Sequence, residues 1–315
     1  MEGQKPMHNS TMQTRYRVQQ AQKAQQDIRT KSAIPVFRLS DKNAIEERSS
    51  TGWLLKWRIP VPNSNRHIWV KAPGFIVEWG GESYAEILTS AVCKDFKYDN
   101  YITYYPCIVI YNSIRLFCCY SYDFCEENNE RLLSYSKLFQ TKSVQLGVVG
   151  IADYKKVLHI INKRTGLNVQ KQFEDILFLD YLVNNLDRGF HNFGVLIKQG
   201  GYCREAPIFD NGNSFNLPSF ENGQYERRYR YSRGETALPF RETFEEQLNL
   251  IRRNRVYRTD FLETRKALKW LMENASEKSN KLDVINNIPL GCFQYIAGML
   301  KQNYQYYKVL FNIQN

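Results

Sequence analysis

Hydrophobic positions along this chain change spacing part-way, from strand-like runs to helical repeats. Apolar side chains three and four residues apart, as on the buried face of a helix, occur at Val169, Phe173, Ile176, Leu177 and Val183. Asn is a frequent helix terminator, so we expect that helix to end near Asn184. Similar spacing predicts a helix over Thr259–Glu273 and another from Pro289 to about Leu310. Pro289 suits a helix start.

The segment from about residue 34 to 125 is rich in β-branched and aromatic residues, which favour strands. Strand-like runs cover residues 53–57, 67–71, 107–111 and 116–120, and a helix from Ser83 to about Val92 interrupts them. We therefore predict an α+β protein with two lobes. Its parts are a polar, flexible tail (1–33), a β-rich N-lobe (34–127) and a helical C-lobe (128–315).

Three polar residues follow the helix that ends near Asn184 in an informative order: Asp187, Asn192 and Asp210. The last begins an Asp-x-Gly after an expected hairpin, whose strands we place at Phe193–Ile197 and Ala206–Phe209. Phosphoryl transfer needs a carboxylate to orient the attacking hydroxyl and oxygen ligands to hold Mg²⁺ on the phosphates. Asp187 fits the first role, and Asn192 and Asp210 fit the second. The alternative is that all three only shape turns.

A kinase site also needs a cation for the non-transferred phosphates and a carboxylate to hold it. Lys71 ends the run 67–71, and Glu86 lies in the helix that follows. Glu82 is the competing partner. Ser83 with Glu86 also has capping-box spacing, so Glu86 could instead bond the backbone at the helix start.

The expected phosphate loop is short and polar, and its residues are Ser49, Ser50, Thr51 and Gly52. One glycine permits close backbone approach to a phosphate. The chain has no G-x-G-x-x-G, and an ordinary turn is the alternative interpretation.

Taken together, the blocks 180–188, 192–196 and 206–215 resemble the HipA-like serine/threonine kinase family, closest to its short members without the extra N-terminal subdomain. The resemblance covers about residues 49–255. It implies a protein-kinase-like fold, use of ATP and Mg²⁺, autophosphorylation on Ser49, Ser50 or Thr51, and an antitoxin-like partner. Related loops place a His two residues after the Asp; here that position is Gly189, and His191 comes two residues later.

The net charge of the 315-residue chain is +11, which favours an anionic partner. One arginine-rich segment that could contact RNA or an acidic protein contains Arg227, Arg228, Arg230 and Arg233. We expect a protein substrate with a Ser or Thr acceptor. The seven cysteines lack C-x-x-C spacing, which indicates buried free thiols.

The chain has no run of 18 apolar residues, so we expect no membrane span. The N-terminus is polar, so we expect no secretory signal and a cytoplasmic protein. Two other functions remain open at this point. One is a small-molecule or lipid kinase, and the other is a pseudokinase or basic nucleic-acid-binding module.

Overall fold

Antiparallel pairing of aromatic and β-branched segments builds the N-terminal half of the protein. The computed structural model describes residues 34–39, 56–73, 80–125, 129–139, 149–198, 200–201, 203–217, 236–252 and 256–313. Five strands form one sheet in the order β1-β4-β5-β3-β2. Their bounds are β1 (Val36–Leu39), β2 (Lys56–Pro60), β3 (His67–Lys71), β4 (Tyr105–Tyr111) and β5 (Ile114–Tyr122).

A tight turn sets the register of β4 and β5. Asn112 and Ser113 both have positive φ, 47° and 65°, as a two-residue hairpin loop of the primed type requires. Tyr111 and Ile114 are therefore paired, and the ladder continues to Tyr105 opposite Tyr120.

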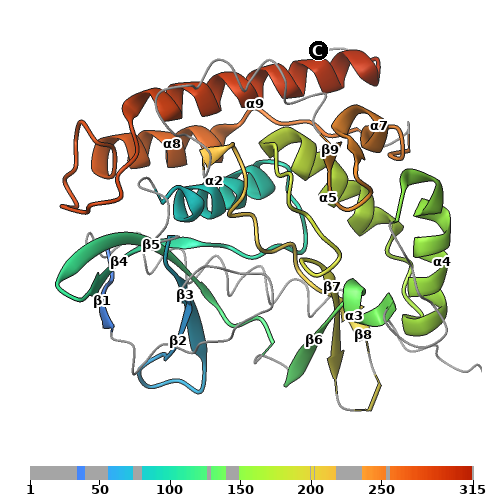
Figure 1. Ribbon diagram of the computed structural model, residues 1–315, viewed down its shortest axis with the longest axis horizontal. Coiled ribbons are helices and arrows are strands. Elements are labelled where there is room, and N and C mark those ends of the chain that lie inside the picture. Colours follow the sequence, from blue (N-terminus) through green and yellow to red (C-terminus); the bar gives the residue numbers. More distant parts are fainter. Residues whose placement is uncertain are drawn as a thin grey trace, which may run out of the picture. The chain divides into compact units, whose positions relative to one another are not determined.

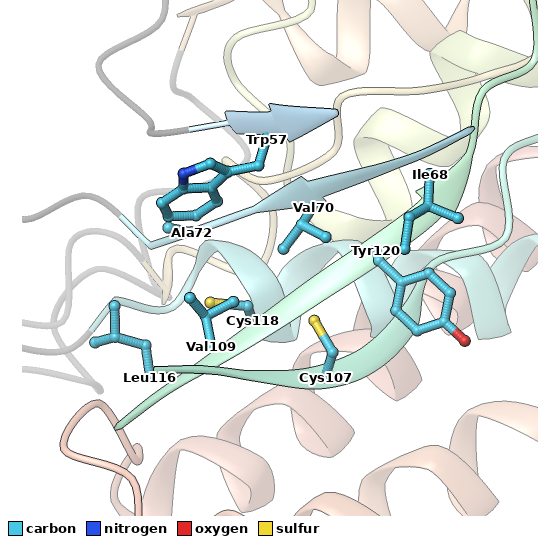
Figure 2. Close-up of a cluster of buried hydrophobic side chains, with 9 residues drawn as sticks. All are labelled: Trp57, Ile68, Val70, Ala72, Cys107, Val109, Leu116, Cys118 and Tyr120. Atoms are coloured by element: carbon cyan, nitrogen blue, oxygen red, sulfur yellow. The ribbon is translucent and has the colours of Figure 1, made fainter. Parts of the chain in front are cut away.

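One face of this sheet forms a hydrophobic core (Figure 2). Its buried side chains are Trp57, Ile68, Val70, Ala72, Cys107, Val109, Leu116, Cys118 and Tyr120. Trp57 pairs with Val70 across β2 and β3, and the next pair along is Lys56 with Lys71. Successive side chains point to opposite faces of a sheet, so the two lysines lie on the face away from this core.

Helix α2 (Glu82–Asp95) lies between that sheet and α8 (Leu262–Asn274) (Figure 1). The carboxylate of Asp95 accepts the backbone N–H groups of Glu263 and Thr264, each at 2.8 Å. These are first-turn N–H groups of α8 that have no partner within their own helix. This long-range cap explains why α8 begins three residues after the Thr259 start that the sequence predicts.

The second half of the chain is mainly helical, with small sheets between the helices. Its helices are α3 (Tyr135–Phe139), η3 (Ile151–Asp153), α4 (Tyr154–Thr165), α5 (Gln170–Val183), α7 (Phe244–Leu248) and α9 (Leu290–Leu310). Its strands are β6 (Glu130–Ser134), β7 (Gly194–Lys198), β8 (Cys203–Glu205), β9 (Thr236–Ala237) and β10 (Glu242–Thr243). An α+β fold with a β-rich first half and a helical second half is confirmed.

The helix before the polar motif ends as predicted. Helix α5 stops at Val183, and Asn184 follows in the left-handed conformation with φ 55°. Helix α9 also begins directly after Pro289 and ends at Leu310.

The predicted return strand over Ala206–Phe209 is wrong. Strand β8 ends at Glu205, and Ile208 forms an isolated parallel bridge with Tyr101 instead. Pro207 has no N–H to donate to a ladder, so pairing with β7 ends before it.

All seven cysteines are free, and five of them are buried. Within the described ranges, none of the helices has the length and apolar character needed to span a bilayer.

Candidate functional site

Lys71, at the end of β3, joins two carboxylates from distant parts of the chain. Its ammonium group donates to Oε1 of Glu86 and, at 3.0 Å, to Oδ1 of Asp210. Of the two glutamates considered from the sequence, Glu86 is the one bonded to Lys71. Three segments thus meet at one cation: strand β3, helix α2 and the loop after β8.

The capping-box interpretation of Glu86 is wrong. The N-cap of α2 is Gly81, which has no side chain that could form a capping box with a glutamate. Glu86 lies one turn inside the helix and is 1% exposed, and its Oε2 accepts the backbone N–H of Asn211 at 2.9 Å. Glu86 therefore binds both Lys71 and the residue directly after Asp210.

Asp210 has an unusual backbone conformation, with φ 60°. A residue other than glycine in this region is uncommon, and such residues concentrate at functional sites. Its backbone N–H points to the hydroxyl oxygen of Tyr104 at 3.5 Å, and the Tyr104 ring lies under the Lys71 ammonium at 4.9 Å. Tyr104 thus contacts both members of the Lys71–Asp210 pair, and it is not among the residues predicted from the sequence.

The loop after α5 folds back on Asp187. The backbone carbonyl of Asp187 accepts the N–H of Gly189 at 2.8 Å and Nδ2 of Asn192 at 3.0 Å. Asn192 is buried whereas Asp187 is exposed. Because Nδ2 of Asn192 donates within the loop, its Oδ1 is the atom that could bind a cation.

Arg188 holds this loop against the segment that carries Asp210. It is fully buried, and its guanidinium forms two bonds of 3.1 Å with the Asp180 carboxylate on α5. The same group donates to the carbonyls of Asn192 and Phe209 and to the side chain of Asn211. A buried charge of this kind needs such a set of partners.

Arg188 has no role among the predictions made from the sequence. Its place directly after Asp187 was the available signal, but arginine is usually exposed and its partners come from separate segments.

The positive charge of a second lysine, Lys56, also acts on Asp210. Lys56 pairs with Lys71 across β2 and β3, and directly opposed like charges are unfavourable without an anion nearby. Burial alone would raise the pKa of Asp210, but the charges of Lys71 and Lys56 outweigh it and hold that pKa well below its usual range. Lys56 is not among the site residues predicted from the sequence, and the signal that points to it is its register opposite Lys71.

Lys71 and Asp187 also have shifted pKa values. Burial lowers the pKa of Lys71, but Glu86, Tyr104 and Asp210 reverse this effect and raise it well above its usual value. Although Asp187 is exposed, partial desolvation of its carboxyl by the surrounding protein raises its pKa, and the charge of His191 opposes that rise. Lys71 is therefore a fixed positive charge beside Asp210.

The donor set fits magnesium better than a transition metal. Mg²⁺ is usually bound by one or two carboxylates together with substrate phosphates, and Asp210 with Oδ1 of Asn192 supplies that kind of oxygen ligand. In the described part of the chain, no three His, Cys, Asp or Glu side chains converge on one metal position. The side chain of Asp210 is 32% exposed, so a ligand can reach it.

Two groups of predicted residues lie outside the described ranges. These are the expected phosphate loop (Ser49, Ser50, Thr51 and Gly52) and the arginine-rich segment (Arg227, Arg228, Arg230 and Arg233).

Comparison with solved structures shows the fold. The chain is similar to the crystal structure of a Helicobacter pylori proinflammatory kinase, CtkA, with a TM-score of 0.57 and 13% sequence identity. The match covers 89% of this chain and 100% of that one. The protein therefore has a kinase-like fold, as the sequence predicts.

Comparisons at the sequence level give no family. No family model matches the chain, and no curated protein matches it significantly.

Proposed function

We propose that this protein is a phosphotransferase, an ATP- and Mg²⁺-dependent kinase that modifies Ser or Thr side chains of proteins. The observation that carries the proposal is the bonding of Lys71 to both Glu86 and Asp210. A lysine held by a helix glutamate beside a metal-binding aspartate is the arrangement that kinases use to hold the nucleotide phosphates.

Each site residue has a role in this proposal. Lys71 binds the non-transferred phosphates, and Glu86 orients Lys71. Asp210 and Asn192 bind Mg²⁺, which neutralises charge on the phosphates. Asp187, which is exposed beside this site, orients the acceptor hydroxyl and takes its proton.

Lys56 extends the proposed phosphate site. It lies opposite Lys71 on the same face of the sheet, and its charge acts on Asp210. We assign Lys56 to the phosphates nearest the metal, because a second cation there offsets negative charge that Lys71 alone leaves uncompensated.

Membership of the HipA-like group is part of the proposal and rests on the sequence blocks around Asp187, Asn192 and Asp210. On that basis we expect a cytoplasmic enzyme with an antitoxin-like partner. Arg227, Arg228, Arg230 and Arg233 would provide contacts to RNA or to an acidic protein surface.

The proposal is tested by incubating the purified protein with Mg²⁺ and ATP labelled on the γ-phosphate. We expect label on the protein itself, mapped by mass spectrometry to Ser49, Ser50 or Thr51, and label on serine or threonine of added proteins. Asp187→Ala should lower both by about 10²–10⁴-fold, whereas replacement of an exposed aspartate elsewhere, Asp99→Ala, should leave both unchanged. Label found on metabolites or lipids but never on protein would favour a small-molecule kinase instead.

Phosphate on the proposed loop also has a predicted consequence. It adds nearly two negative charges next to the ATP phosphates, so the modified form should be less active. A modified form with higher activity would contradict this self-inhibition and leave the kinase proposal in place.

A further inference from the structure

A short segment before β4 pairs with the residues that lead to Asp210. The backbone N–H of Ile208 donates to the carbonyl of Asn100 at 3.0 Å, and the N–H of Ile102 donates to the carbonyl of Ile208 at 2.9 Å. These two bonds make the parallel bridge between Tyr101 and Ile208. The residues before β4 therefore lie alongside the chain that carries Asp210.

A side chain takes over where this backbone pairing ends. In a parallel ladder the N–H of Asp210 would bond next to the carbonyl of Ile102, but that carbonyl faces the hydroxyl of Ser90 at 3.2 Å. The backbone of Asp210 turns into the left-handed region, with φ 60°, and its N–H points to the hydroxyl oxygen of Tyr104 at 3.5 Å. The Tyr104 hydroxyl thus takes the place of the next backbone partner.

Tyr104 is fixed by the helix that carries Glu86. It is 5% exposed, and its backbone N–H donates to the hydroxyl oxygen of Ser90 at 3.0 Å. Ser90 lies one turn after Glu86 on α2, and its hydroxyl donates to the Glu86 carbonyl at 2.9 Å. The same helix therefore holds Lys71 through the Glu86 carboxylate and places the Tyr104 ring through Ser90.

The ring contacts Lys71 without adding charge to the site. The ammonium group of Lys71 lies over the Tyr104 ring, 4.9 Å from its centroid, and such cation–π attraction is stronger where water is excluded. The other two partners of this ammonium, Glu86 and Asp210, are carboxylates and would repel phosphate oxygens. The ring attracts the ammonium and does not repel phosphate in this way.

We propose that Tyr104 is a positioning residue for the nucleotide phosphates. Its ring holds the Lys71 ammonium, and its hydroxyl supports the backbone turn that directs the Asp210 carboxylate. This inference rests on the kinase function proposed above. Both charged groups are then in place before Mg²⁺-ATP binds, so less conformational freedom is lost on binding.

Substitutions that separate the ring from the hydroxyl test this role. Tyr104→Leu removes both and should weaken Mg²⁺-ATP binding by about 10- to 30-fold, because a cation–π contact in a water-poor site and a long hydrogen bond are lost. Tyr104→Phe keeps the ring and should weaken binding only about two- to threefold. Calorimetry measures both. Adenosine, which has no phosphates, should bind Tyr104→Leu as tightly as it binds the wild type.

The effect of the ring should depend on Lys71. When Lys71→Ala is already present, Tyr104→Leu should weaken Mg²⁺-ATP binding only about two- to threefold further, since residues that share one interaction are not additive. A double variant that loses the product of the two single effects would overturn the inference. So would wild-type affinity in Tyr104→Leu, or a Tyr104→Phe variant as weak as Tyr104→Leu.

A second buried tyrosine provides a matched control. Tyr304 on α9 is 8% exposed, and its ring centroid lies 5.6 Å from the ammonium of Lys308. Tyr304→Leu should lower thermal stability much as Tyr104→Leu does but bind Mg²⁺-ATP as the wild type does; an equal loss of affinity would overturn the inference. Should Tyr104→Leu fail to fold, Tyr104→Met, whose flexible side chain fills irregular gaps, replaces it with the same expected loss.

Failure of the kinase function can be told apart from failure of this inference. An aromatic ring shifts the NMR signals of groups that lie over its face, so the ε-methylene signal of Lys71 reports the contact. With ¹³C-labelled lysine, this signal is assigned by its loss in Lys71→Ala. It should move strongly in Tyr104→Leu and little in Tyr304→Leu. An unmoved signal in Tyr104→Leu would overturn the inference even for a protein that transfers no phosphate, whereas a moved signal in a protein that binds no Mg²⁺-ATP would contradict the proposed function.

Discussion

The ammonium group of Lys71 lies 3.0 Å from Oδ1 of Asp210, although 139 positions separate the two residues in the sequence. Glu86 is bonded to the same ammonium group. One positive charge thus couples strand β3, helix α2 and the loop after β8. The Lys71 side chain that carries this charge is only 12% exposed. Loss of Lys71 leaves two carboxylates together without their shared cation.

Lys71→Ala should weaken binding of Mg²⁺-ATP by about 10- to 100-fold, because a hydrogen bond to a charged group contributes about 1.5–3 kcal/mol. Isothermal titration calorimetry measures this loss. Lys137→Ala removes an exposed lysine of α3 and should bind as the wild type does. Equal affinity for Lys71→Ala and wild type would remove Lys71 from the proposed nucleotide site.

Arg188→Ala should lower the free energy of unfolding by about 3–5 kcal/mol, since it leaves Asp180 buried without its partner. Urea unfolding measures the change. Lys269→Ala breaks an ion pair between exposed side chains and should cost at most about 1 kcal/mol. Replacing both members, as in Asp180→Leu with Arg188→Met, should recover much of the loss; a double variant as unstable as Arg188→Ala would contradict this account.

Glu263→Gln should destabilise the protein most near neutral pH. Hydrogen bonds from Lys266 and from Lys94 on α2 lower the pKa of Glu263 to about 2 in the folded state. The stabilisation is present above the usual pKa of Glu263 and is lost as the pH falls toward 2. Wild-type and Glu263→Gln unfolding curves should therefore converge as the pH falls through that range, and a constant difference would exclude this linkage.

Local signals predicted the helix before the site well. The end of α5 depends on Asn184, whose side chain tolerates the left-handed conformation, and that preference is visible in the sequence. The end of β8 was misplaced by four residues, from Glu205 to Phe209, although Pro207 was a local warning against a continued strand.

Long-range features were harder to predict. The burial of Arg188 depends on Asp180, Asn211 and two backbone carbonyls that only the fold brings together. Likewise, the choice between Glu82 and Glu86 depends on where α2 begins, and Gly81 sets that start. The sequence supplies the residue types of the site, whereas their pairing follows from packing.

Mg²⁺-ATP binding and phosphate transfer should depend on different carboxylates. A comparison of Asp187→Ala with Asp210→Asn tests this most directly. Mg²⁺-ATP affinity is measured by calorimetry and phosphate transfer by labelled ATP for each variant. Asp187→Ala should bind Mg²⁺-ATP nearly as tightly as wild type but transfer phosphate about 10²–10⁴-fold more slowly. Asp210→Asn should weaken binding more, because an amide lacks the charge that opposes a divalent cation. Wild-type transfer by Asp187→Ala, or unchanged affinity in Asp210→Asn, would contradict the account.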